Sequence, residues 1–190
     1  MKVFGVAEDE VTSRQRSIAK TVNFSIIYGI SEYGLSTDLQ ISFKEAGALI
    51  KEYGVQFPEV TGYLESLKVV GEKLGYVETM FGRRRNLVEL KSQNRNVRNF
   101  GFRAAMNTPI QGTAADIIKI AMNRVSNALS EELPDAKLVM QVHDELIVEC
   151  PEKDAAAAAG ILKREMEAAA SLSVPLVAEV GTGKDWLSAK

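Results

Sequence analysis

The sequence predicts an α+β protein, with a mostly helical first half followed by a half in which helices pack on an antiparallel sheet. Helix-capping signals recur along the first half, whereas two β-rich runs stand only two residues apart after Pro134. The 190 residues are enough for a sizeable core, and 46% hydrophobic and 25% charged residues are ordinary globular values.

Three helices are expected in the first 75 residues from the signals at their ends. A capping box, in which Ser or Thr precedes Gln or Glu by three places, opens two of them. A proline suits the first turn of the third, and glycines end all three. The expected spans are 12–29, 42–54 and 58–74, with the capping pairs Thr12/Gln15 and Ser42/Glu45.

Two strands and more helix are expected next. Tyr76–Phe81 and Arg84–Val88 have the composition of strands joined by a turn at Gly82-Arg83. Residues 94–106 are expected to be helical, and Thr108-Pro109 starts or kinks a helix that continues to about residue 131.

The second half begins with a hairpin. Lys137–Val142 and Glu145–Cys150 are β-rich and flank His143-Asp144, which predicts a two-residue turn. An alanine-rich helix over about 154–170 and a last strand over 176–180 complete the expected elements.

Charge is unevenly distributed. Seven basic residues and one acid lie between Arg83 and Arg103, a balance of +6, while residues 131–190 hold twelve acids and six bases, a balance of −6. Such asymmetry suits a protein that grips a polyanion in one place and holds cations in another. On charge alone, a solvated basic surface beside an acidic domain is the slightly better explanation.

Cysteine content and hydropathy limit the cellular compartments in which the protein is expected. A single cysteine, Cys150, excludes a disulfide framework or a multi-cysteine metal site within the chain and suits a reducing compartment. No apolar run approaches the ~18 residues that span a bilayer. We therefore expect a cytoplasmic protein with no membrane partner. A monomer is expected as well.

Four residues of the first expected helix, spaced by four, form a candidate site. Arg16, Lys20, Phe24 and Tyr28 share a stripe about 120° wide and about 18 Å long. Cations lie at one end and aromatic rings at the other, as the phosphates and the base do in a nucleoside triphosphate. Solvated cations beside core-packed rings are the alternative, and the spacing alone favours it.

Residues 16–29 resemble the nucleotide-binding helix of family A DNA polymerases, the group of bacterial DNA polymerase I. The family pattern Arg-x3-Lys-x3-Phe-x3-Tyr-Gly is matched at every fixed place, with departures at Ser17, where Arg is common, and Ser25, where Gly is usual. The resemblance implies that the two cations neutralise the leaving pyrophosphate as catalytic groups. It also implies that Phe24 packs on the sugar and Tyr28 lies near the nascent base pair.

The hairpin agrees with this resemblance. Gln141–Glu145 is similar to the family's carboxylate hairpin, which carries one of two aspartates that hold catalytic magnesium. Asp144 is therefore the expected catalytic metal ligand, and carboxylates suit Mg²⁺. Glu145 ranks second, because strand alternation turns it away unless the turn rotates it. His143 is expected at the DNA, although simple turn chemistry is the alternative for His143-Asp144.

A third segment joins them. Arg103, Asn107 and Gln111 lie four apart, and residues 107–113 resemble the family stretch that contacts primer and template. Amide donors suit the degenerate acceptors of the minor groove. Pro109 makes their shared face conditional on a kinked rather than broken helix.

Two further segments match the family, so that the resemblance covers essentially the whole chain. Gly82–Arg85 is similar to a family hairpin, which adds Arg84 to the expected DNA contacts, and Val180–Trp186 matches near the end. The resemblance implies a fingers subdomain over 1–92, with the nucleotide-binding helix at about 13–28. Residues 93–190 would form the C-terminal part of the palm, with the carboxylate hairpin at 137–150.

The implied activity is template-directed transfer of deoxynucleotides to a primer 3′-hydroxyl in DNA replication and repair, with two Mg²⁺ ions. Its partners would be primer–template DNA and deoxynucleoside triphosphates. In the family, the first catalytic aspartate lies upstream of the fingers. We therefore expect this chain to be a C-terminal piece of a polymerase and inactive alone.

Two alternatives stay open. A single-subunit RNA polymerase shares the Arg, Lys and Tyr-Gly places of the helix, but Asn23-Phe24 favours the DNA enzyme. A non-catalytic DNA-binding module would bind DNA without any need for Asp144.

Overall fold

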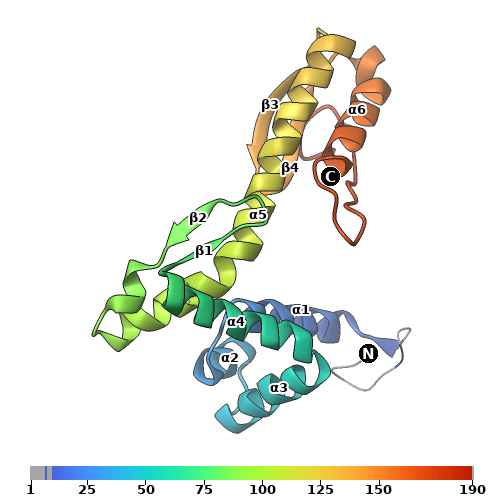
Figure 1. The fold of residues 1–190 in the computed structure, drawn as a ribbon. Coiled ribbons are helices and arrows are strands. Elements are labelled where there is room, and N and C mark those ends of the chain that lie inside the picture. Colours follow the sequence, from blue (N-terminus) through green and yellow to red (C-terminus); the bar gives the residue numbers. More distant parts are fainter. Residues whose placement is uncertain (1–6, 8–9, 190) are drawn as a thin grey trace. The chain divides into compact units, whose positions relative to one another are not determined.

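The computed structural model describes residues 7 and 10–189, and it divides into two compact units, 1–111 and 112–190. Helices with two small antiparallel sheets confirm the predicted α+β class (Figure 1). The expectation about what precedes the first helix falls mostly outside the described residues. The subdomain boundary at 92/93 stays a prediction.

The first helix, α1 (Ser13–Ile27), begins as predicted. Thr12 Oγ1 accepts a hydrogen bond from the backbone N–H of Gln15 at 3.2 Å, and Gln15 Oε1 accepts one from the Thr12 N–H at 2.9 Å. Tyr28 is the C-cap, and Gly29 follows with φ +75°, a conformation that glycine adopts without strain. Both hydrogen bonds of the predicted capping box are therefore present.

Three more helices follow α1, and two of them share its core. α3 (Phe43–Gln56) starts at the predicted Ser42 capping box, and α4 (Pro58–Leu74) has Pro58 in its first turn and Gly75 as a left-handed C-cap. Between α1 and α3 lies α2 (Glu32–Leu39), which the sequence analysis missed; Ser31 caps it, but no Glu or Gln stands three places later. The common core of α1, α2 and α3 consists of Val22, Ile26, Leu35, Ala46 and Tyr53.

A two-stranded sheet follows. β1 (Tyr76–Glu78) pairs antiparallel with β2 (Arg84–Asn86), and both strands are shorter than expected. The Thr79 hydroxyl accepts hydrogen bonds from the backbone N–H groups of Phe81 and Arg83, so the chain turns earlier than the apolar pattern indicates. A 3₁₀ helix, η2 (Val88–Lys91), comes next.

One long helix, α5 (Arg95–Glu132), replaces the two expected around Pro109. Proline removes one backbone donor and crowds the preceding turn, but it does not end this helix. Apolar packing holds the helix on both sides of the proline: Ala104 and Ala105 are buried with Val77 and Leu87, and Val125 is buried in the second unit.

The second unit contains the predicted hairpin. β3 (Lys137–Val142) pairs antiparallel with β4 (Glu145–Glu149), and Val142 stands opposite Glu145, which leaves a two-residue turn. The 3₁₀ helix η3 (Glu152–Asp154) leads into α6 (Ala155–Glu167). The core lies between α5, the hairpin and α6, and comprises Ala121, Val125, Leu129, Ala136, Leu146, Ile161 and Ala169.

The predicted last strand is wrong. Residues 176–180 form no strand. A strand exists only when its backbone pairs with a neighbour, and here the Ala178 N–H donates instead to Glu167 Oε1 at 3.2 Å. Among the described residues, no helix is long and apolar enough to cross a membrane.

Candidate nucleotide, metal and DNA sites

Helix α1 has two four-spaced stripes on roughly opposite sides. Ile18, Val22 and Ile26 face the core, whereas Arg16, Lys20 and Phe24 are exposed. The Phe24 side chain is 44% exposed and that of Val22 only 2%. The alternative in which the stripe's aromatic rings fill the core therefore does not hold here.

The exposed stripe keeps its cations and rings available. Arg16 and Lys20 form no ion pair with any residue that the structure describes. The Phe24 and Tyr28 rings lie with centroids 6.0 Å apart and planes tilted by 35°, a favourable aromatic contact. Tyr28 belongs to the C-cap rather than the helix proper, yet its ring continues the stripe.

Helix α3 fixes the same part of α1 through a contact that sequence reasoning missed. The Tyr53 hydroxyl donates to Asn23 Oδ1 at 2.8 Å. Burial raises the pKa of Tyr53, so this hydroxyl keeps its proton and remains a donor. Asn23 directly precedes Phe24, and the two partners lie 30 residues apart, which no local periodicity reveals.

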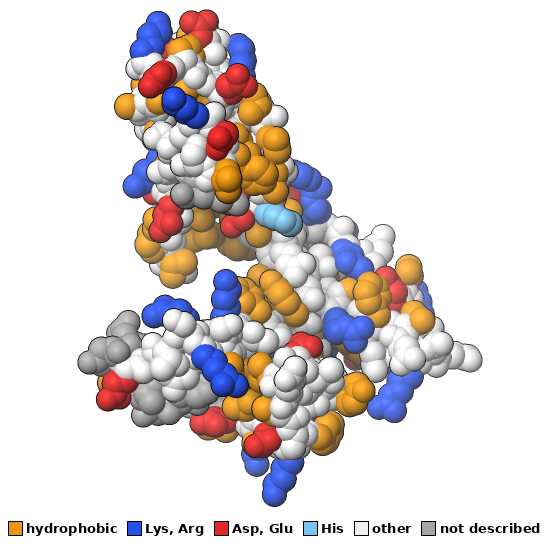
Figure 2. Space-filling model, turned by 180° about the vertical axis from the view of Figure 1, so that it is seen from behind, with side chains coloured by type: hydrophobic (Ala, Val, Ile, Leu, Met, Phe, Trp, Pro, Cys, Tyr) orange, Lys and Arg blue, Asp and Glu red, His pale blue; other side chains and the backbone are white. Residues whose placement is uncertain are grey.

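The hairpin turn presents its polar side chains to solvent. Asp144 is exposed, and so is His143, the chain's one histidine (Figure 2, pale blue). His143 takes the left-handed conformation, with φ +53°, and its carbonyl accepts a hydrogen bond from the Gln141 side chain. The turn therefore places its unusual backbone angle at His143 rather than at Asp144.

Glu145 has a partner of its own. Its Oε2 accepts a hydrogen bond from Trp186 Nε1 at 3.1 Å. Among the described residues, no group of three or more His, Cys, Asp or Glu gathers to hold a metal. The donor set at the turn is thus two adjacent exposed carboxylates, Asp144 and Glu145. Such a set fits Mg²⁺, which commonly takes one or two carboxylates and completes its shell with water and phosphate oxygens.

The face of α5 in the first unit carries the third candidate set. Because α5 continues through Pro109, Arg103, Asn107 and Gln111 lie on one helix at four-residue spacing. Arg103 and Gln111 are exposed; Asn107 is half-buried, and its Oδ1 has no hydrogen-bond partner among the described residues. A Cβ at Gly29 would lie 3.3 Å from Arg103 Cγ, so the end of α1 meets this face.

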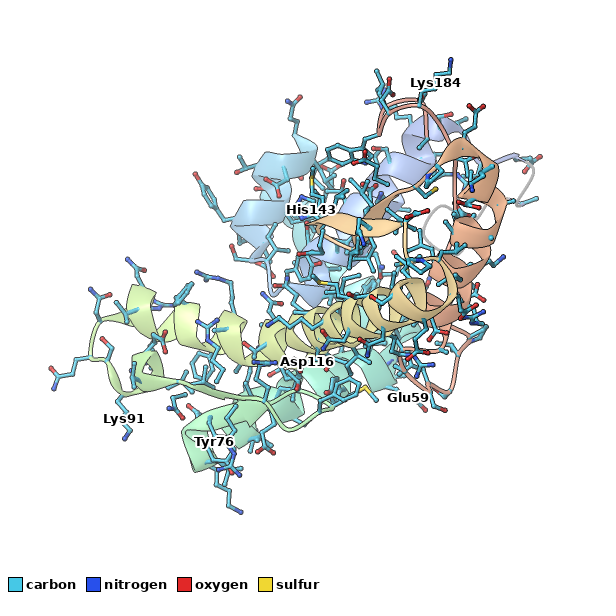
Figure 3. All side chains as sticks on the ribbon, turned by 90° about the horizontal axis from the view of Figure 1, so that it is seen from above. Glu59, Tyr76, Lys91, Asp116, His143 and Lys184 are labelled. Atoms are coloured by element: carbon cyan, nitrogen blue, oxygen red, sulfur yellow. The ribbon has the colours of Figure 1, made fainter. Side chains whose placement is uncertain are left out.

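The basic segment 83–103 contains two kinds of cation. Arg84 Nε lies 2.6 Å from Glu78 Oε1 and its guanidinium 4.5 Å from the Tyr76 ring centroid; the bond to Glu78 raises the pKa of Arg84. In contrast, Lys91, Arg95 and Arg98 are exposed and form no ion pair with a described residue. Lys91 points away from the fold (Figure 3).

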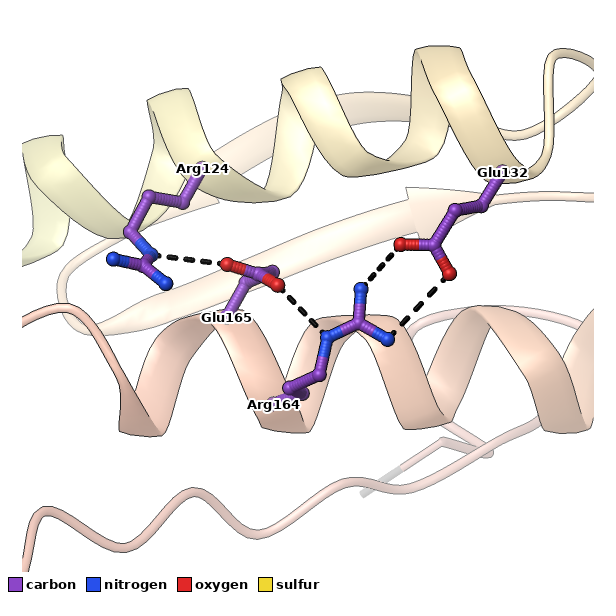
Figure 4. A network of polar contacts seen from close by, with 4 residues as sticks. All are labelled: Arg124, Glu132, Arg164 and Glu165. Atoms are coloured by element: carbon purple, nitrogen blue, oxygen red, sulfur yellow. Dashed lines mark hydrogen bonds and ion pairs between the residues drawn. The ribbon is translucent and has the colours of Figure 1, made fainter.

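Ion pairs join helices α5 and α6 and stabilise their packing. Glu165 accepts from Arg124 Nε at 2.9 Å and from Arg164 Nε at 2.8 Å, and Arg164 also pairs with Glu132 (Figure 4). The Glu165 side chain is 13% exposed, and its bond to Arg164 lowers its pKa. Sequence spacing gave no signal for this network, because its members come from two helices.

Comparison with known proteins decides the family. A family model described as DNA polymerase family A matches residues 1–188. The chain belongs to DNA polymerase family A. The recognition made from the motifs of α1, α5 and the hairpin is confirmed.

Named relatives agree with this membership. DNA polymerase I of Bacillus subtilis is 49% identical over 190 residues, which are 100% of this chain and 22% of the relative. The thermostable DNA polymerase I of Thermus aquaticus is 45% identical over 188 residues, covering 99% of this chain and 22% of that protein. The chain thus spans about a fifth of the length of these family A relatives.

A solved family A structure has the same fold. The POL domain of Pol1 from M. smegmatis, in complex with DNA primer-template and dNTP, superposes with a TM-score of 0.95 and 41% sequence identity. The match covers 99% of this chain and 33% of that one.

Proposed function

We propose that this chain supplies the nucleotide-binding helix and a metal-binding carboxylate to a DNA polymerase that extends a primer along a template, in DNA replication and repair. The exposed stripe of α1 carries the proposal, because its two cations have no partner among the described residues while its opposite side is in the core. The relatives are named DNA polymerase I, and the Pol1 structure holds primer-template and dNTP.

In this proposal, each of the four stripe residues of α1 contacts a different part of the triphosphate. Arg16 binds phosphate oxygens through its guanidinium fork, and Lys20 adds a mobile point charge that also donates a proton to the leaving pyrophosphate. Phe24 packs on the sugar, and Tyr28 extends that apolar surface to the base. Because the four residues lie on one side of α1, a single triphosphate can contact all of them.

At the hairpin, Asp144 would hold the metal, with Glu145 as the second carboxylate. Two Mg²⁺ ions in the complete site would supply stabilisation of the charge on the entering and leaving oxygens. The turn places both carboxylates in solvent, where substrate phosphates can complete the ligand shell.

Primer–template DNA is the proposed polymeric partner. Asn107 and Gln111 offer amide groups to the minor groove, and the exposed Gln111 amide is the better placed of the two, because Asn107 Oδ1 is buried. Arg103, Arg84 and His143 contact the sugar–phosphate backbone in this proposal. Arg84 already pairs with Glu78, so its contribution is the smaller one. A monomer in the cytoplasm remains the prediction from sequence.

The test uses a carrier polymerase, defined as the Bacillus subtilis relative with its matching segment replaced by this chain. Asp144→Asn should lower primer extension by about 10³-fold or more, whereas Glu149→Gln, a matched exposed acid on β4, should not. Equal activity in Asp144→Asn and its parent would refute the proposal. The isolated chain should not extend primers, because Asp144 alone does not position two Mg²⁺ ions between the hydroxyl and the phosphate.

The same experiment distinguishes the proposed function from a non-catalytic DNA-binding module. Such a module predicts that Asp144→Asn leaves both DNA binding and carrier activity unchanged. The RNA polymerase alternative predicts that the carrier uses ribonucleotides at least as well as deoxynucleotides, and the family match argues against it.

A further inference from the structure

The end of the second unit is a closed loop. The backbone N–H of Ser188 donates to Asp185 Oδ1 at 2.8 Å, and that of Ala189 to the Asp185 carbonyl at 3.1 Å. A Cβ on Gly181 would lie 1.8 Å from the Ala189 carbonyl oxygen, so only glycine permits the chain to fold back here. Trp186 is therefore held on a fixed backbone.

Trp186 reaches from this loop to the hairpin. Its indole Nε1 lies 3.1 Å from Glu145 Oε2, across 41 residues of sequence. An indole is a donor without charge, so it fixes a carboxylate oxygen without neutralising it. Arginine or lysine in the same place would compete with a cation for the carboxylate.

We propose that Trp186 is a positioning residue for the metal site: it holds Glu145 in one orientation beside Asp144. This rests on the proposed function of the hairpin. Strand alternation alone would turn the Glu145 side chain to the opposite face from Asp144, and the hydrogen bond from Trp186 is a contact that orients its carboxylate. Hydrogen bonds that orient metal-binding side chains commonly govern metal affinity.

The bond itself is tested in the 190-residue chain. With one tryptophan in the sequence, a ¹⁵N-labelled sample gives a single indole N–H cross-peak. Glu145→Ala should move that peak, and Glu149→Gln should leave it in place. An indole peak at the same position in the chain and in Glu145→Ala would overturn the proposal.

The consequence is tested in the carrier polymerase. Trp186→Phe keeps a ring but removes the donor, so the Mg²⁺ concentration for half-maximal rate should rise about tenfold. The KM for the deoxynucleotide and the melting temperature should stay unchanged. Leu187→Ala, at an 86% exposed neighbour, is the matched control and should behave as the parent.

The outcomes separate the two claims. If Asp144→Asn retains activity, the proposed function fails, whatever Trp186→Phe does. If Asp144→Asn is inactive but Trp186→Phe keeps the parental Mg²⁺ dependence, only the role of Trp186 is refuted. An equal shift in Leu187→Ala refutes it as well, because the effect would then belong to the loop.

Discussion

Helix α1 and the α5–α6 network both display two cations, but they use them in opposite ways. Arg124 and Arg164 are 44% and 52% exposed and still engage Glu165 and Glu132. Arg16 and Lys20 are also exposed, yet they have no acidic partner among the described residues. Exposure therefore does not distinguish a cation that joins two helices from one without an acidic partner; the ion pairs of the described residues do.

The basic segment repeats this contrast at closer range. Arg84 forms an ion pair with Glu78 across the β1–β2 pair. Arg85 Nη2 lies 3.7 Å from Glu89 Oε1. Arg95 and Arg98, in the first turn of α5, are exposed without an ion pair to a described residue. The arginines of this one basic segment therefore divide into those that form an ion pair within the chain and those that form none with a described residue.

The largest expected effect comes from removing an unpartnered cation. Lys20→Ala in the carrier polymerase should lower kcat/KM for deoxynucleotides by about 10²–10³-fold, because a preorganised charge at the leaving phosphate is lost. The melting temperature should not change, since the side chain is exposed. Steady-state kinetics on a primed template measure the first, and calorimetry the second.

Lys163→Ala is the matched control, because Lys163 is an exposed lysine on α6. It should keep the parental kcat/KM. A loss in Lys163→Ala comparable with that in Lys20→Ala would show that net charge, rather than the stripe of α1, binds the triphosphate.

The substitution that tests the aromatic end of the stripe is Phe24→Tyr. The added hydroxyl can replace the 3′-hydroxyl that a dideoxynucleotide lacks, by a hydrogen bond of about 0.5–1.5 kcal/mol. The ratio of kcat/KM for deoxy over dideoxy substrates should therefore fall about two- to tenfold, while ordinary incorporation changes little. An unchanged ratio would place Phe24 away from the sugar, although its ring is exposed.

Sequence alone predicted what depends on near neighbours along the chain. The capping boxes of α1 and α3, the proline start and glycine end of α4, and the two-residue turn of the hairpin follow from residues within four places of each other. The stripe of α1 was predictable for the same reason, since one helix period generates it.

Contacts between distant segments were not predictable. The strand expected at 176–180 needed an edge to pair with, and Glu167 takes its backbone donor instead. Whether Pro109 breaks or only interrupts a helix depends on packing along both sides of it. The bonds Tyr53–Asn23 and Trp186–Glu145 join separate elements, so no local spacing signals them.

Glu165→Gln tests whether the ion pairs between α5 and α6 stabilise the fold. Glu165 is mostly buried between two arginines, so losing its charge should lower the free energy of unfolding of the chain by about 1 kcal/mol. Glu149→Gln, at an exposed glutamate, should have no measurable effect. Denaturant unfolding of both variants measures the difference.

The same pair of proteins has a defined pH dependence. The pKa of Glu165 lies below its ordinary value of 4.5 in the folded chain, chiefly through its bond to Arg164. Its contribution is therefore complete above about pH 4.5 and is lost as pH falls through the lowered pKa. The stability gap between the chain and Glu165→Gln should be widest near neutrality and close in acid. A gap that widens on acidification would contradict the assignment.

The smallest expected effect separates the two arginine populations of the basic segment. If Arg98 faces a DNA phosphate, Arg98→Ala should reduce the slope of log affinity against log salt by about 1, through one fewer released counterion. Arg84→Ala should reduce it by less, because Glu78 already neutralises that guanidinium at 2.6 Å. Both variants are exposed-surface changes on neighbouring elements, so folding effects should cancel in the comparison. The measurement is the affinity of this chain for a primer–template duplex between low and moderate salt. Equal slopes for the two variants would mean that an intramolecular carboxylate does not decide which arginines bind DNA.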